Sequence, residues 1–182
     1  MTNTGTLQSF QQIFGYCKNL FGQKMKDYNA AWRVLRVSSL TDQILIKAKR
    51  IRSIQMKEVN LVEEGVENEF VGIVNYATMA IIQLRLGVSE SADLDFDKAN
   101  RIFTDVLQEA ALLMEKKNHD YGEAWRSMRV SSITDIILMK LLRIKQIEDN
   151  QGNTIVSEGV DANYFDIINY AVFALILLDF KP

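Results

Sequence analysis

Apolar side chains recur at helical intervals along most of this 182-residue chain. From Ser9 onwards, steps of three and four residues place aromatic and aliphatic side chains on one face of a helix. The same spacing recurs in other segments, which cover residues 40–56, 102–114 and 133–149 and two strongly apolar stretches that begin near Glu64 and Glu158. The pattern therefore predicts six long helices and an all-α helical bundle.

The chain contains an internal repeat. Residues 27–42 return as residues 120–135, and each copy contains Asp-Tyr, one Trp and two Arg. Residues 64–84 return as residues 158–178, and both copies contain Asn-Tyr-Ala. Two copies are too few for a solenoid, which needs about three or more. We therefore expect two tandem copies of a three-helix unit that pack together as a pseudo-dimer.

The repeat also predicts the domain boundaries. Residues 1–8 are polar and lack apolar spacing, so they are expected to form a flexible tail. Residues 9–86 form the first helical repeat and residues 98–182 the second, with one shared core. Residues 87–97 are acidic and contain Ser, which is typical of a linker.

Two Ser-containing segments predict where the second helix of each repeat begins. Ser39 and Asp42 in the first repeat, like Ser132 and Asp135 in the second, are three residues apart at the start of an apolar run. This spacing is a variant of the capping box, in which the Ser hydroxyl accepts a hydrogen bond from a backbone N–H. We expect N-caps at the two serines, and Asp135 is better interpreted as part of a cap than as a ligand.

The composition of the chain limits the kinds of partner that it is expected to bind. The chain is 48% hydrophobic and 24% charged, as in soluble globular proteins, and its net charge of −2 gives no basic field for nucleic acid in bulk. Cys17 is the single cysteine, which excludes an internal disulfide and favours the cytoplasm. The first residues do not resemble a signal peptide. The longest apolar run, residues 167–178, is shorter than the roughly 20 residues that span a bilayer, so no membrane partner is expected.

The third helix of the second repeat carries a candidate metal site. Glu158 and Asp161 are three residues apart, so they share a helix face and could hold Mg²⁺ through oxygen ligands. Asp166 and Asn169 repeat this spacing further along. In the alternative interpretation, the first carboxylates only complement the helix dipole. Because Gly72 stands in the first repeat where Asp166 stands in the second, we expect the second repeat to carry the complete site.

Cations and aromatic residues upstream could bind the rest of a nucleotide. Lys140 and Arg143 share a helix face, and Arg126 precedes them. Arg offers a fork of donors that fits phosphate, although these cations could instead pair with the carboxylates inside the bundle. Tyr and Trp side chains can stack on a base, or serve as core residues. The predicted substrate-binding residues are Asp120, Tyr121, Trp125, Arg126, Lys140, Arg143 and Asn169.

These motifs resemble the nucleotide modification associated domain family, which is found in bacteria and phages. A K-x-x-D-Y-G…W motif begins at Lys117, and a D-x-x-N-Y-A motif begins at Asp166. The resemblance covers nearly the whole chain, once per repeat. It implies a protein that handles nucleotides.

More distantly, the chain is similar to the all-α nucleoside triphosphate pyrophosphohydrolases of the MazG and dimeric dUTPase group. Those proteins are helical bundles, often dimeric, and hold Mg²⁺ with an E-x-x-E pair and an E-x-x-D pair. The Glu158-x-x-Asp161 pair matches the second, while the second helix offers Asp135, Lys140 and Arg143 in place of the first. The resemblance implies Mg²⁺ as cofactor, with Glu158, Asp161 and Asp166 as its ligands, and a nucleotide as partner.

Two functions therefore stay open. One is Mg²⁺-dependent hydrolysis of nucleoside triphosphates. The other is a non-catalytic nucleotide-binding or helical assembly module, in which the charged residues form internal ion pairs. Either can form homo-oligomers beyond the intramolecular pseudo-dimer. The two differ in geometry, because hydrolysis needs carboxylates that converge in an open cleft.

Overall fold

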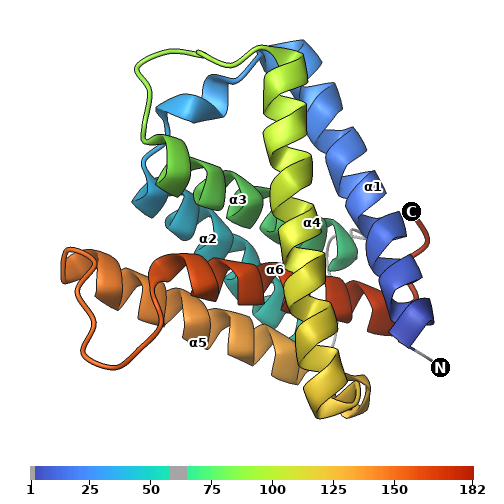
Figure 1. Cartoon of the computed structure of the whole chain (residues 1–182). Helices are drawn as coiled ribbons and strands as arrows, with labels where there is room; N and C mark the ends of the chain where they lie inside the picture. The colour runs from blue at the N-terminus through green and yellow to red at the C-terminus, as the bar shows by residue number, and fades with distance from the viewer. Residues whose placement is uncertain (1–2, 58–64) are drawn as a thin grey trace.

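The computed structural model describes residues 3–57 and 65–182, which fold as a helical bundle (Figure 1). The elements in chain order are α1 (Asn3–Tyr28), η1 (Ala31–Val34), α2 (Val37–Met56), α3 (Glu67–Leu86), α4 (Phe96–Tyr121), η2 (Ala124–Ser127), α5 (Val130–Asp149) and α6 (Val160–Leu177). No strand occurs within these residues, so the all-α prediction is confirmed. Each repeat supplies three long helices and one short 3₁₀ helix.

The helices of the two repeats pair with their own counterparts. α3 and α6 cross at the centre of the bundle, α2 packs against α5, and α1 packs against α4 (Figure 1). This arrangement is that of a two-fold dimer made within one chain. A single hydrophobic core spans both repeats, which confirms the pseudo-dimer prediction.

The central position of α6 explains its composition. Within the described residues, α6 alone is long and apolar enough to cross a membrane, but 61% of its apolar window is buried inside the bundle. A helix that is apolar on nearly all sides must be covered by protein when it lies in a core. α6 therefore behaves as the core helix of a soluble protein.

The flexible tail predicted for residues 1–8 is wrong for the residues described there, because α1 begins at Asn3. Thr6 is fully buried. Its hydroxyl hydrogen-bonds to the Glu123 carboxylate and accepts from Arg126 NH2 at 2.7 Å. These partners lie far along the chain, so local polarity could not reveal that this segment docks on the second repeat.

The predicted N-caps at Ser39 and Ser132 are also wrong. α2 and α5 begin at Val37 and Val130. Their cap positions are the extended Arg36 and Arg129, three residues before the serines, and neither helix has a side-chain cap. The preceding 3₁₀ helix already sets the direction of the chain, so the serines fall in the first turn. A side-chain cap does occur at α4, where Asp95 accepts a hydrogen bond from the backbone N–H of Lys98 at 2.8 Å.

The third helices start later than the sequence pattern predicts. α3 begins at Glu67 and α6 at Val160. Glu64, the predicted start of the first, lies outside the described residues. Glu158 precedes α6, so it does not share a helical face with Asp161.

Candidate functional site

The Trp-containing turn of each repeat is held by its first arginine. In the first repeat Arg33 is buried, and its guanidinium donates to Asp93 Oδ1 at 2.8 Å and to the Gly87 carbonyl at 2.8 Å. In the second, Arg126 donates to Glu123 Oε2 at 2.9 Å and lies over the Trp125 ring, 4.4 Å from its centroid. Both arginines therefore anchor the turn. Arg126, a predicted substrate-binding residue, already has internal partners.

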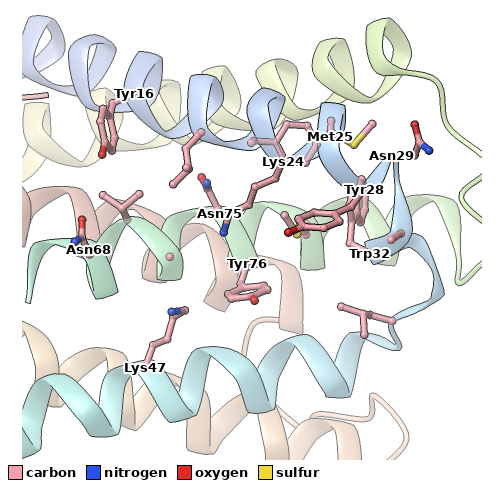
Figure 2. Close-up of a pocket in the computed structure, with 17 residues that line it drawn as sticks. Tyr16, Lys24, Met25, Tyr28, Asn29, Trp32, Lys47, Asn68, Asn75 and Tyr76 are labelled. Atoms are coloured by element: carbon pink, nitrogen blue, oxygen red, sulfur yellow. The ribbon is translucent and has the colours of Figure 1, made fainter. Parts of the chain in front are cut away.

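In the first repeat, α1, η1, α2 and α3 surround a cavity of about 550 Å³ (Figure 2). Apolar side chains form much of its wall. Its polar and aromatic lining includes Lys24, Lys47, Asn68, Asn75, Tyr76 and Trp32. The cavity lies in the repeat to which the sequence assigned no complete site.

Two lysines enter this cavity from opposite sides. Lys24 comes from α1 and Lys47 from α2, and both side chains point toward α3 between them (Figure 2). Lys47 Nζ donates to Glu69 Oε2 at 3.2 Å, and Arg50 NH1 donates to Glu69 Oε1 at the shorter distance of 2.8 Å. Within the described part of the chain, Lys24 has neither a hydrogen bond nor an ion pair.

Gly72 gives Lys47 its position. A Cβ atom at Gly72 would lie 2.6 Å from Lys47 Cε, so the lysine side chain covers the bare helix backbone at this point. Asn75, one helical turn further on, donates through Nδ2 to the Cys17 carbonyl at 3.2 Å and thereby holds α3 to α1. Its Oδ1 and Trp32 Nε1 are buried and lack a partner among the described residues.

The second repeat fills the same positions with side chains. The counterparts of the two cavity lysines are Lys117 and Lys140, which donate to Asp166 at 2.5 and 2.7 Å. Asp166 stands where the first repeat has Gly72. Burial opposes ionisation of Asp166, but the hydrogen bonds and charges of the two lysines outweigh it and lower the pKa of this carboxyl below its ordinary value.

A ring replaces a flexible side chain at a second position. Phe173 is the counterpart of Met79 and stacks on Trp125, with ring centroids 4.2 Å apart and planes inclined by 10°. Phe165 likewise replaces Val71. The second repeat thus holds a carboxylate and a stacked ring where the first repeat has Gly72, covered by the Lys47 side chain, and Met79.

The predicted metal ligands do not converge. Glu158 and Asp161 are exposed, and Asp166 is engaged with two lysines. Among the residues that the structure describes, no three Asp, Glu, His or Cys side chains lie where they could hold a metal ion. Because α6 starts after Glu158, the spacing of three residues does not bring these carboxylates together on one helix face.

The predicted substrate-binding residues of the second repeat are separated from one another. Asp120 and Tyr121 are exposed at the end of α4, whereas Trp125 is buried under Phe173. Asn169 donates to the Ala110 carbonyl at 3.0 Å, which joins α6 to α4.

Lys140 and Arg143 line a surface groove of about 710 Å³ beside residues 150–158. Lys140 is already paired with Asp166, so Arg143 is the exposed cation there. This arrangement agrees with the alternative of internal ion pairs.

Sequence reasoning missed the first-repeat residues that line the cavity. Lys24 and Lys47 carried a usable signal, since both are repeated as Lys117 and Lys140 while their shared carboxylate is not. Of the two, Lys47 pairs with Glu69 instead, whereas Lys24 has no internal anion among the described residues, which points to space for another anion. Asn68 and Tyr76 gave no such signal.

A sequence profile of the nucleotide modification associated domain 1 family matches residues 24–84 and 117–178. The chain therefore belongs to this family and contains its domain twice in tandem. The matched segments run from the end of the first helix of each repeat, through the Trp turn, to the third helix. No curated protein and no solved structure gives a significant match, so the similarity to the all-α pyrophosphohydrolases stays a prediction.

Proposed function

We propose that this protein binds a nucleotide in the cavity of its first repeat and that the second repeat is a closed copy which completes the bundle. One observation carries the proposal. The lysine pair that holds Asp166 in the second repeat is present in the first as Lys24 and Lys47, where it faces a cavity. Lysine is a common ligand of phosphate in proteins.

The remaining lining suits the rest of a nucleotide. Trp32 and Tyr76 provide ring faces on which a base can stack. Asn68 and Asn75 provide amide groups on the cavity wall. A volume of about 550 Å³ lies within the range of roughly 300–1,000 Å³ that is typical of small-molecule sites.

The proposal is one of binding. The described carboxylates do not fit a Mg²⁺ site, because Asp166 is neutralised by lysines and Glu158 and Asp161 stand apart at the surface. We therefore assign no metal-dependent hydrolytic step to them. The family's association with nucleotide modification supports the choice of a nucleotide as the small-molecule partner.

We also propose that the protein acts in the cytoplasm, because a single unpaired cysteine is typical of a reducing compartment. Cys17 is fully buried and unpaired, and burial raises the pKa of its thiol to about 12. Such a thiol stays protonated and is a poor nucleophile, so the cysteine acts here as a small core residue.

A thermal-shift panel of ribo- and deoxynucleotides, with and without Mg²⁺, tests the proposed binding. A nucleotide present at 100 times its dissociation constant should stabilise the fold by about 2.7 kcal/mol. The control is Met79→Phe, which introduces into the first repeat the ring that Phe173 provides in the second. We expect a shift in the parent and none in this variant. The absence of a shift with every nucleotide would refute the proposal.

A further inference from the structure

The second repeat indicates which nucleotide the cavity accepts, an inference that rests on the proposed function. We infer that the ligand is a nucleoside monophosphate, whose single phosphate bridges Lys24 and Lys47 at the place that Asp166 occupies in the second repeat. The base then lies at the place of Phe173. The second repeat thus carries, as side chains, the anion and the ring that the ligand supplies to the first.

The position of the phosphate follows from the paired helices. Asp166 lies on α6 and receives Lys117 from α4 and Lys140 from α5. The first repeat has the corresponding lysines on α1 and α2, and Gly72 of α3 removes the carboxylate between them. Carboxylate and phosphate both present anionic oxygen acceptors to an ammonium group. The flexible Lys47 side chain lies over Gly72, and a phosphate that displaces it from there can take the two contacts that Asp166 makes.

The number of phosphates follows from charge. Of the residues that line the cavity in the described part of the chain, two are charged, and both are lysines. A phosphate monoester carries a charge of about −1.5 to −2 at pH 7, which two lysines balance. The second and third phosphates of a triphosphate would lack a partner. Residues 58–64 add no cation, because their sequence contains Glu but neither Lys nor Arg.

The Glu69 carboxylate leaves Lys47 available for this role. Glu69 accepts from Arg50 at 2.8 Å and from Lys47 at 3.2 Å, so its shorter contact is with the arginine. Lys47 also lies 5.8 Å from the centroid of the Tyr76 ring. Its ammonium group can turn from Glu69 to a bound phosphate, as the ammonium group of Lys140 meets Asp166.

The position of the base follows from the Trp turn. Phe173 stacks on Trp125, whereas the described rings near Trp32 include Phe21 in an edge contact at 6.0 Å and none stacked face to face. Seven residues of helix separate Asp166 from Phe173, or about 10 Å along the axis. The anion and the ring are thus at different ends of the cavity, with room for a sugar between them.

Calorimetric titration of the full chain without Mg²⁺ tests this inference. The probes are adenosine, guanosine, cytidine, uridine and thymidine 5′-monophosphates, with the matching nucleosides and triphosphates. We expect one monophosphate to bind at least tenfold more tightly than its nucleoside and its triphosphate, since one charged hydrogen bond is worth about this factor. Lys24→Gln should lower the monophosphate affinity about tenfold and leave the nucleoside affinity unchanged. The matched control is Lys117→Gln, in the second repeat, which should leave both affinities unchanged.

The outcomes separate the inference from the proposed function. If a triphosphate binds as tightly as the monophosphate, the inference fails and nucleotide binding stands. If Lys24→Gln and Lys117→Gln have equal effects, the phosphate does not lie in the first repeat, and the inference also fails. If no nucleotide, nucleoside or triphosphate binds, the proposed function fails and the inference with it. Lys24 is exposed, so its substitution should not prevent folding.

Discussion

Replacing Asp166 by Asn removes the negative charge between Lys117 and Lys140 with almost no change in volume. The side chains of Asp166 and Lys140 are 16% and 11% exposed, so the lysine would stay largely buried without its anion. Breaking a fully buried pair in this way costs about 3–5 kcal/mol. Lys117 is 55% exposed, so solvent screens its part of the interaction. We therefore expect Asp166→Asn to lower the free energy of unfolding by about 2 kcal/mol at pH 7.

The loss should depend on pH in a defined direction. Burial opposes ionisation of Asp166, but the two lysines lower its folded-state pKa below the ordinary value. A carboxyl with a lowered pKa stabilises the fold above its unfolded pKa, which is about 3.9 for Asp, and this contribution disappears as pH falls through the folded pKa. The difference between parent and variant should thus be complete at pH 7 and shrink below about pH 4.

Urea denaturation followed by circular dichroism at several pH values measures this difference. Asp135→Asn is the matched control, because Asp135 is 62% exposed and lies 3.8 Å from Arg52, so it should cost less than about 0.5 kcal/mol. Equal unfolding midpoints for the parent and Asp166→Asn at pH 7 would refute the reasoning. Nucleotide affinity should be unchanged in this variant, since the proposed site lies in the first repeat.

Three further predictions concern the rest of the bundle. Burial raises the pKa of Glu148, so its ionisation costs stability as pH rises through the folded pKa. Glu148→Gln, which copies Gln55 of the first repeat, should raise the free energy of unfolding at pH 8 by about 0.5–1 kcal/mol and show no gain below pH 4. Urea denaturation at the two pH values measures this difference. Ser132→Ala should leave the free energy of unfolding almost unchanged, whereas Asp95→Ala should lower it by about 0.5–2 kcal/mol because Asp95 caps α4. Equal losses of unfolding free energy in the two variants would contradict the cap assignment. A fragment of residues 1–88 should self-associate in sedimentation experiments, because α3 loses its cover by α6, and a soluble monomer would contradict the shared core.

The helices and the repeat could be predicted from sequence because both depend on local patterns. Apolar spacing placed α2 and α5 within a few residues, and the internal match predicted the pairing of the two halves. The starts of α2 and α5 depend instead on the 3₁₀ helices that precede them, and a Ser-x-x-Asp pattern does not predict these. Thr6 was assigned to a tail because its partners, Glu123 and Arg126, come from the other repeat.

The sequence pattern and the proposed site point to different repeats for a chemical reason. A carboxylate on a helix serves equally well as a metal ligand and as the counter-ion of a lysine, and only its neighbours decide between these roles. In the sequence, Asp166 indicates a complete site in the second repeat, whereas in the structure it occupies the space between Lys117 and Lys140. Gly72, which marks the first repeat as incomplete in the sequence, lines the cavity beneath the Lys47 side chain.

The central claim is that the first-repeat cavity is the nucleotide site, and Gly72→Asp tests it most directly. The new carboxylate would lie between Lys24 and Lys47. The flexible Lys47 side chain, 2.6 Å from a Cβ at this position, can move aside and donate to it, as Lys140 donates to Asp166. Calorimetric titration of the parent and Gly72→Asp with the nucleotide that binds the parent should show binding in the parent and none in the variant, at unchanged or higher melting temperature. Undiminished affinity in a folded Gly72→Asp protein would contradict the claim.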